Sequence, residues 1–399
     1  MRICIVVSHL GGGGAEHVAA MLANGFADKG HEVYLATDLV REGHYDLQDN
    51  VNTYNIITYN KKPLLKWIAA TYNLRKLFMR KRPDVVLGIM ELCSAISKIA
   101  AFGMGIPVIS TEHNSFERPV NAPFSKMEYF SKYWLNRLFD AVTVLTYADK
   151  KAIGSKIKHI AVMPNPLAFR PVEEITKKKS FVMAVGRLDD WYTKGFDVLI
   201  KAWGILKRSS ITSNATGQIL DKANVSEIQK YSLKIVGEGS KKSSEYLTQL
   251  SKECGVEDSV EILGFRKDID ALYQEAMIFV LSSRYEGFGL VLIEAMSQGC
   301  APVACDYKGR QREIINPSSV LPQWEEEQSA AVSEFCVCDN GILCEPDNAE
   351  QLAAAIARMI SDDKYRVSVQ QNAISRSRYY SIENTVDRWE QLLNSLIRK

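Results

Sequence analysis

Short apolar runs alternate with helix-length stretches along almost the whole of this 399-residue chain. The first run, residues 3–8, leads into a glycine-rich turn, and a helical pattern follows over residues 15–29. Uninterrupted apolar runs of this kind suit strands that are buried on both faces, as in a parallel sheet covered by crossover helices. The alternation therefore predicts an α/β fold.

The pattern occurs twice, with a polar break in the middle. Residues 170–179, RPVEEITKKK, are aperiodic and contain a proline, which is typical of a linker. We therefore predict two Rossmann-like domains, residues 1–170 and 171–380. Further strands are predicted at residues 32–36, 84–90, 106–110, 141–145 and 159–163 of the first domain, and at 181–185, 233–236, 260–262, 277–281 and 301–304 of the second.

The second half also contains helical patterns and two long polar tracts. The tracts, residues 209–230 and 316–334, are long for α/β loops and are predicted to be surface insertions. From residue 349 the pattern predicts a nearly continuous helix to residue 398. The other helices of this half are predicted at residues 196–207, 240–252 and 290–298.

Composition narrows the class of protein. Hydrophobic residues make up 46% and charged residues 24%, which excludes a disordered or collagenous chain. The eight cysteines are thinly spread, as expected of reduced thiols, and the single close pair, Cys336 and Cys338, lacks a second pair at zinc-finger spacing. The N-terminal apolar run is too short for a signal peptide or a membrane span. A cytoplasmic protein without a bound metal is expected.

Charge is unevenly divided along the chain. Residues 1–172 carry a net charge of +7 and the remainder −5, and eight cations fall within residues 61–82, a window without acidic residues. Apolar residues recur there at helical spacing, which predicts a basic amphipathic helix. It is either a crossover helix whose cations are only solvated, or a helix whose outer face binds anionic lipid or a lipid-linked pyrophosphate. In the second case Lys61, Lys62, Lys66 and Trp67 face the membrane. No nucleic-acid-binding motif accompanies these cations, so nucleic acid is not an expected partner.

Glycines follow the first strand and precede a helix, a position that suits phosphate. Gly11 and Gly13 match the first two glycines of a dinucleotide fingerprint, but Glu16 stands in the third place. Asp38 after the second strand keeps nicotinamide or flavin binding open as an alternative. A tight turn without a ligand is the other alternative.

In the second half, cations and glycines again follow strands. Arg187 follows one strand and Lys194 opens the next helix, so the two side chains can converge on a diphosphate. The residues Gly237, Glu238 and Gly239 end another strand at the same edge of the predicted sheet, where ligands bind in open α/β folds.

The segment SRYEGFGLVLIEAM, residues 283–296, carries two carboxylates eight positions apart. Glu286 lies before the predicted helix and Glu294 in its second turn, so both can reach one polar ligand. The alternative is that neither residue binds a ligand, with Glu286 a charged loop residue and Glu294 a solvated residue of the helix. Glu294 interrupts an apolar run, however, and burying an unpaired carboxylate costs several kcal/mol.

Taken together, these motifs resemble glycosyltransferase family 4, the retaining nucleotide-sugar glycosyltransferases of GT-B architecture. The resemblance spans nearly the whole chain and implies two Rossmann-like domains that face each other across a cleft, with a final helix, residues 381–399, returning to the first domain. Its motifs are GGAE near the start, TEHN at 111–114, MPNP at 163–166, GRL followed by KG, GEG, and the E-x7-E segment.

The resemblance also implies roles for individual residues. Arg187 and Lys194 would bind the donor diphosphate, Glu294 the ribose hydroxyls and Glu286 the transferred sugar, with His113 near the reacting centre. Further donor contacts would come from Gly13, Gly14, Gly186, Gly237, Glu238, Gly287, Phe288, Gly289 and Leu290, and the loop facing acceptor and phosphate would include Gly12, Glu16 and Asn114.

The implied reaction moves a sugar from a nucleotide diphosphate sugar, commonly a UDP-sugar, to a saccharide or lipid-linked saccharide. It needs no metal or cofactor, and the enzyme would be peripheral at the inner face of the membrane. A GT-B-fold epimerase and a catalytically silent partner subunit are the alternatives. The chain departs from the family at 310–313, where RQRE replaces the common GPRE, and at Trp191 and Tyr192, which add bulk beside the predicted phosphate site.

Overall fold

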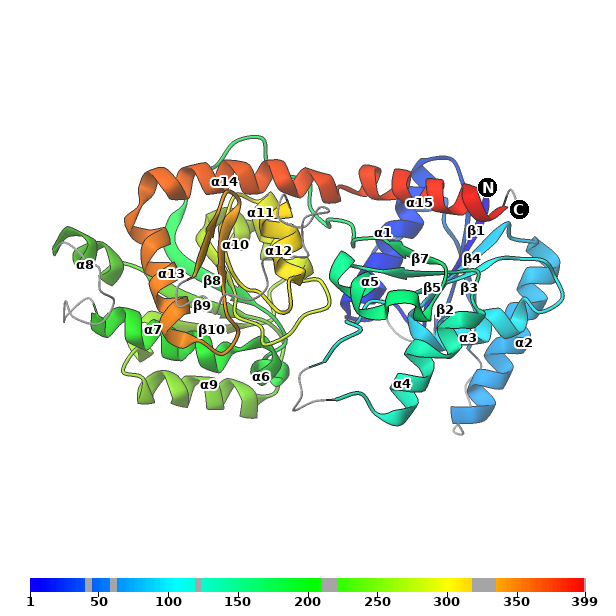
Figure 1. Ribbon diagram of the computed structural model, residues 1–399, viewed down its shortest axis with the longest axis horizontal. Coiled ribbons are helices and arrows are strands. Elements are labelled where there is room, and N and C mark those ends of the chain that lie inside the picture. The colour runs from blue at the N-terminus through cyan, green and yellow to red at the C-terminus, as the bar shows by residue number, and fades with distance from the viewer. Residues whose placement is uncertain (40–44, 58–62, 119–122, 210–221, 318–334, 398–399) are drawn as a thin grey trace. The chain divides into compact units, whose positions relative to one another are not determined.

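The computed structural model describes residues 1–39, 45–57, 63–118, 123–209, 222–317 and 335–397 (Figure 1). The chain divides into two compact units, Met1–Ala168 with Tyr380–Lys399, and Phe169–Tyr379. Each unit contains a seven-stranded sheet flanked by helices. The predicted α/β fold with two Rossmann-like domains is therefore confirmed.

The sheet of the N-terminal unit has the order β3-β2-β1-β4-β5-β6-β7, and all neighbouring strands are parallel. Strand β3 was not expected, because its Asn-Thr-Tyr-Asn sequence is polar and mostly exposed at the edge of the sheet. The strands are β1 Arg2–Val6, β2 Glu32–Thr37, β3 Asn52–Asn55, β4 Val85–Ile89, β5 Val108–Thr111, β6 Ala141–Val144 and β7 Ile160–Val162.

Helices α2, α3 and α4 supply most of the helical side of one core in this unit. Leu74 and Phe78 of α2, Ile96 of α3 and Tyr133 at the end of α4 are buried in the same cluster as Val86 of β4. The predicted basic helix is thus a crossover helix that covers the sheet. The helices of the unit are α1 Gly14–Asp28, α2 Pro63–Lys81, α3 Met90–Ala100, α4 Lys126–Tyr133, α5 Tyr147–Ile153 and α15 Ile382–Ile397.

Helix α15, the last helix of the chain, packs against α1 (Figure 1). Gly25 of α1 leaves room for this contact, because a Cβ there would lie 2.8 Å from the side chains of Ile382 and Val386. His31 Nε2 lies 2.6 Å from Glu390 Oε1. The C-terminal helix therefore belongs to the N-terminal unit, as the resemblance implied.

We expect Trp389→Ala to lower the free energy of unfolding by about 3 to 5 kcal/mol, the usual loss for a buried tryptophan. Trp389 is buried in α15, whereas Ile397 at the end of the same helix is exposed. Ile397→Ala is therefore the matched control, with an expected change within about 0.5 kcal/mol. Urea denaturation followed by circular dichroism measures both. Equal stability of the two variants would contradict the docking of α15.

The sheet of the C-terminal unit has the order β10-β9-β8-β11-β12-β14-β13, parallel except for the β13–β14 pair. Strands β13 and β14 were not predicted from the sequence. The strands are β8 Lys179–Val185, β9 Ser232–Val236, β10 Val260–Gly264, β11 Ala276–Leu281, β12 Ala301–Cys305, β13 Cys336–Cys338 and β14 Gly341–Cys344.

The prediction about the end of the chain was wrong in part. The expected continuous helix from residue 349 is three helices, because Asp362 ends one and caps the next and residues 378–381 precede the third. Part of the predicted insertion 209–230 forms helix α8, while residues 210–221 and 318–334 lie outside the described residues. The helices are α6 Trp191–Lys194, α7 Phe196–Ser209, α8 Lys222–Gln229, α9 Lys241–Glu253, α10 Ile269–Glu275, α11 Leu290–Ser297, α12 Arg310–Ile315, α13 Ala349–Ser361 and α14 Asp363–Ser377.

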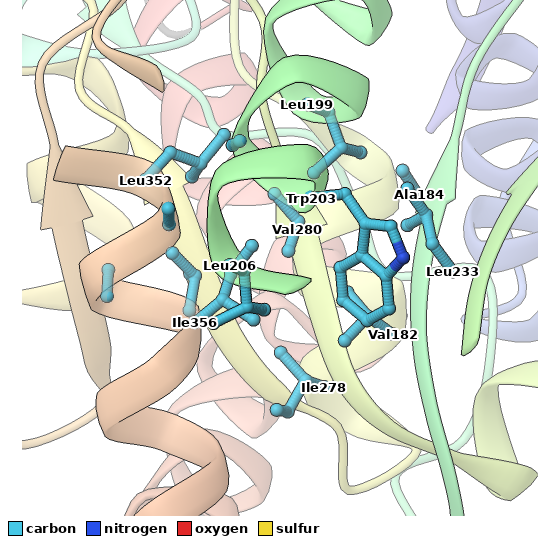
Figure 2. Close-up of a cluster of buried hydrophobic side chains, with 14 of the residues drawn as sticks. Val182, Ala184, Leu199, Trp203, Leu206, Leu233, Ile278, Val280, Leu352 and Ile356 are labelled. Atoms are coloured by element: carbon cyan, nitrogen blue, oxygen red, sulfur yellow. The ribbon is translucent and has the colours of Figure 1, made fainter. Parts of the chain in front are cut away.

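The core of the C-terminal unit is organised around Trp203 of α7 (Figure 2). Its indole is fully buried, and its Nε1 donates a hydrogen bond to Ser259 Oγ at 3.0 Å. Val182 of β8, Val280 of β11 and Ile356 of α13 belong to the same cluster. This packing fixes the strands whose carboxyl ends carry the predicted donor residues.

Candidate active site

In the N-terminal unit, the glycine-rich loop connects β1 to α1, which begins at Gly14. The Gly11 N–H donates to His9 Nδ1 at 3.1 Å, and Tyr45 Oη donates to the Gly13 carbonyl at 3.0 Å. Glu16 lies in the first turn of α1, with Oε1 3.8 Å from His9 Nε2. Hydrogen bonds therefore hold this loop to one side chain that precedes it in the sequence and to one that follows it.

His113 follows β5 at the same carboxyl edge of this sheet. Its Nε2 lies 3.2 Å from Thr111 Oγ1, whose hydroxyl also donates to the Gly88 carbonyl at 3.1 Å. Because a hydroxyl has a single proton to donate, this geometry assigns the imidazole proton to Nε2 and leaves Nδ1 as an acceptor. Burial lowers the pKa of His113 to about 4, against the opposing effects of Glu112 and Asn165, so the ring is neutral at pH 7.

Asn165 is a site residue that the sequence prediction did not include. It is buried in the turn after β7, and its side chain interacts with the His113 imidazole. The signal was present, because Asn165 lies in the MPNP turn that carries part of the family resemblance. A neutral imidazole acceptor beside a carboxamide can bind a sugar hydroxyl.

In the C-terminal unit, Arg187 follows β8 and lines a cavity of about 340 Å³. The other lining residues are Asp189, Glu238, Gly239 and Ser240. Asp189 accepts hydrogen bonds from Ser240 N, Ser240 Oγ and Ser243 Oγ at 2.6 to 2.9 Å, which lower its pKa to about 2. The cavity thus joins the ends of β8 and β9 at the N-terminus of α9.

Two glycines bring backbone segments of this site into close contact. A Cβ at Gly237 would lie 1.8 Å from the Gly186 carbonyl oxygen, and a Cβ at Gly195 would lie 2.0 Å from the Ser282 carbonyl oxygen. No side chain fits at either position. Gly237 therefore allows the ends of β8 and β9 to approach, and Gly195 allows the corner between α6 and α7 to approach the end of β11.

The two charged residues predicted to meet diphosphate and sugar are paired with each other. Lys194 Nζ lies 2.6 Å from Glu286 Oε1, which also accepts a hydrogen bond from Ser283 Oγ at 2.9 Å. Burial acts to lower the pKa of Lys194, but the Glu286 carboxylate outweighs it and the pKa is raised. Lys194 is therefore positively charged at pH 7 and positioned beside a carboxylate.

Arg284 packs against Tyr192, one of the two bulky residues that depart from the family pattern. Its guanidinium lies 4.0 Å from the centre of the Tyr192 ring and makes two hydrogen bonds to Asp197, at 2.7 and 2.8 Å. The backbone N–H of Arg284 also donates a hydrogen bond to the Thr193 carbonyl at 2.9 Å. The loop that carries Lys194 is thereby fixed to the segment that carries Glu286.

Glu294 is 9% exposed in the second turn of α11. Its Oε2 accepts a hydrogen bond from Tyr273 Oη at 3.3 Å. Burial raises its pKa to about 7, and the Tyr273 hydrogen bond opposes this only partly. The solvated alternative for Glu294 is thus excluded.

We expect stability and nucleotide affinity to respond in opposite ways to pH. Because the pKa of Glu294 rises from 4.5 to about 7 on folding, the folded chain keeps a proton that the unfolded chain releases, and stability falls as pH rises through this window. In the role that the family resemblance implies for Glu294, a carboxylate accepts hydrogen bonds from two ribose hydroxyls better than a carboxylic acid does, so nucleotide affinity should increase between pH 6 and about 8. Calorimetry in buffers of different ionisation enthalpy should detect proton release on UDP binding near pH 7. Proton uptake would contradict this assignment.

The remaining predicted donor residues lie at the start of α11, and the predicted loop residue Asn114 follows β5. Phe288 is buried, Gly289 precedes α11 and Leu290 begins it. Asn114 is exposed, and its carbonyl lies 3.4 Å from Lys132 Nζ.

The predicted membrane residues lie on α2 or just before it. Lys66 Nζ is 3.5 Å from Asp38 Oδ2, so Asp38 takes part in an ion pair within the unit. Trp67 packs against the core cluster. Lys61 and Lys62 lie outside the described residues.

Comparisons with known proteins agree with the observed fold and with the family resemblance of the motifs. Residues 12–168 match the model of Glycosyltransferase Family 4, and residues 167–376 match that of Glycosyl transferases group 1. A relative in Campylobacter jejuni, GalNAc-α-(1→4)-GalNAc-α-(1→3)-diNAcBac-PP-undecaprenol α-1,4-N-acetyl-D-galactosaminyltransferase, is 24% identical over 98% of both chains.

Two solved structures share the fold. Sucrose-phosphate synthase from Thermosynechococcus elongatus has a TM-score of 0.76 at 18% identity, covering 100% of this chain and 99% of the other. Anabaena HepE in complex with UDP has a TM-score of 0.73 at 19% identity, covering 99% and 100%. With a parallel sheet in one unit, a largely parallel sheet in the other and a family match over more than half its length, the chain belongs to the group 1, family 4 glycosyltransferases of GT-B fold.

Proposed function

We propose that this glycosyltransferase moves a sugar from a nucleoside diphosphate sugar, with UDP as the nucleotide, to a saccharide or lipid-linked saccharide in glycan assembly. The pairing of Lys194 with Glu286 carries the proposal, because an ammonium group can bind a diphosphate and a carboxylate beside it can accept hydrogen bonds from sugar hydroxyls. UDP in the HepE complex and the undecaprenol-linked acceptor in the name of the Campylobacter relative support these substrate classes.

The proposed reaction retains the configuration at the transferred carbon. The bond from the anomeric carbon to the diphosphate oxygen breaks, and the acceptor oxygen bonds to the same face. The acceptor proton passes to the leaving diphosphate. Arg187 and Lys194 neutralise the charge that develops on this group, as positioned donors do in other sites of this kind. In this proposal no metal ion or cofactor takes part.

Location and partners follow from the same proposal. A lipid-linked acceptor places the enzyme on the cytoplasmic face of a membrane, and the cations of α2 favour anionic lipid. Two alternatives are a nucleotide-sugar epimerase and a silent partner subunit. The first turns over donor without acceptor, and the second does not turn over donor at all.

A donor hydrolysis screen across UDP-, GDP- and ADP-sugars tests the proposal. We expect slow release of UDP from one UDP-sugar and retention at the anomeric carbon, read by NMR at early times. Lys194→Ala should abolish the signal, whereas Lys179→Ala removes an exposed lysine paired with Glu275 and should not. Release of an epimerised nucleotide sugar, or no turnover of any donor with or without acceptors, would reject the proposal.

A further inference from the structure

Helix α4 and the 3-10 helix η1 (Leu135–Leu138) that follows it carry a row of exposed apolar side chains, here called the α4 stripe. The first three members are three or four positions apart, so they share one side of α4, and the fourth lies in η1. Their exposed fractions are between 54% and 76%. The stripe consists of Met127, Phe130, Trp134 and Leu138.

The opposite side of the same segment is buried and holds the His113 loop. Lys132 Nζ lies 2.9 Å from Glu112 Oε2, and the two side chains are only 3% and 1% exposed. Asn136 Nδ2 donates to Glu112 Oε1 at 2.9 Å. Glu112 precedes His113 directly, so the position of α4 is coupled to the position of His113.

Exposed cations flank the α4 stripe. Arg137 lies 4.6 Å from the centre of the Trp134 ring and donates from Nε to the Lys156 carbonyl at 2.9 Å, and the Lys156 side chain is itself exposed. Lys126 is exposed at the start of α4. The acidic residue of the helix, Glu128, is held in the capping box with Ser125 and pairs with Arg118.

We propose that the α4 stripe is the surface by which the N-terminal unit docks on an anionic lipid bilayer. Aromatic and aliphatic side chains on one face with flanking cations are the composition of helices that lie in a membrane interface. A second copy of the chain is the poorer occupant, because a symmetric contact would bring the same cations together. Trp67 packs on the core and is not available for a lipid contact, whereas the members of the α4 stripe are exposed.

The inference rests on the proposed function, because it supplies the lipid surface that holds the acceptor. Docking through α4 brings lipid to the helix that holds Glu112, and therefore close to the loop that carries His113. Within the described parts of the chain, no helix is long and apolar enough to cross a membrane.

The test uses the full-length chain with vesicles of phosphatidylglycerol and with vesicles of phosphatidylcholine. Phe130→Ser combined with Trp134→Ser should weaken sedimentation with the anionic vesicles by about tenfold or more, since it removes two large apolar side chains from the interface. Val367→Ser, at an exposed apolar position on α14 of the other unit, is the control and should bind like the parent. Brominated lipid should quench tryptophan fluorescence in the parent and much less in Trp134→Ser.

Donor hydrolysis separates this inference from the proposed function. The double variant should hydrolyse donor at the parent rate while transfer to a lipid-linked acceptor falls. If the parent does not hydrolyse any donor, the proposed function is rejected, and the vesicle experiment alone then decides the docking proposal. Unchanged binding of the double variant to anionic vesicles would overturn the docking proposal, as would equal binding of the parent to both lipids. A dimer that the double variant converts to a monomer, with vesicle binding unchanged, would assign the stripe to self-association instead.

Discussion

Arg187→Ala and Lys194→Ala should each lower the rate of sugar transfer by about 100-fold or more, the usual effect of removing one positioned donor to developing charge. Lys194 is held in place by Glu286, and Arg187 lines the cavity at the ends of β8 and β9. Steady-state transfer and single-turnover hydrolysis measure the effect.

Conservative variants show whether the geometry matters beyond the charge. Arg187→Lys should recover only part of the rate, because an ammonium cannot make the two parallel hydrogen bonds of a guanidinium. Lys194→Ala also leaves the half-buried Glu286 without its cation, so Lys194→Ala combined with Glu286→Gln should be folded more stably than Lys194→Ala alone. Near-parental transfer by both alanine variants would place the diphosphate elsewhere.

Local patterns in the sequence predicted most of the buried strands, although the short buried strand β14 was missed. Strands such as β4 and β11 are apolar throughout, so their sequences carry the signal. The edge strand β3 does not, because its side chains are mostly exposed and its pairing with β2 decides its conformation. Helix α8 was missed for a related reason, since its sequence is largely polar and lies in a polar tract.

The site was predictable as a set of residues but not as a set of contacts. The motifs supplied Lys194 and Glu286, yet their pairing joins positions 92 residues apart. The sequence showed Arg284 as part of a motif and Tyr192 as a departure from the family. The stacking of the two side chains depends on the fold. Tyr273 had no sequence signal at all as the partner of Glu294. Contacts between distant segments depend on how strands order in the sheet, which no local pattern contains.

Glu294→Gln should bind nucleotide more weakly than the parent and yet be the more stable protein at pH 8. The parent must keep a carboxylate charged in a buried position where its pKa is about 7, a cost of about 3 kcal/mol relative to an ordinary value. The amide has nearly the same shape and no charge, so that cost is removed. If Glu294 binds the two ribose hydroxyls, as the family resemblance implies, weaker hydrogen bonds to them should lower UDP affinity by about 10- to 150-fold, the effect of losing 1.5 to 3 kcal/mol.

Two measurements separate the functional from the structural effect. Thermal unfolding at pH 5 and pH 8 should show a large difference for the parent and a small one for Glu294→Gln, because the titrating group is gone. Calorimetry should show the loss of UDP affinity together with the loss of proton release. Tyr273→Phe, which removes the hydrogen bond to Glu294 but leaves the carboxylate, serves as the matched variant, and we expect it to raise the pKa of Glu294 further. If Glu294→Gln is less stable than the parent at pH 8 and binds UDP equally well, Glu294 is a structural residue, and the ribose is bound by another part of the C-terminal unit.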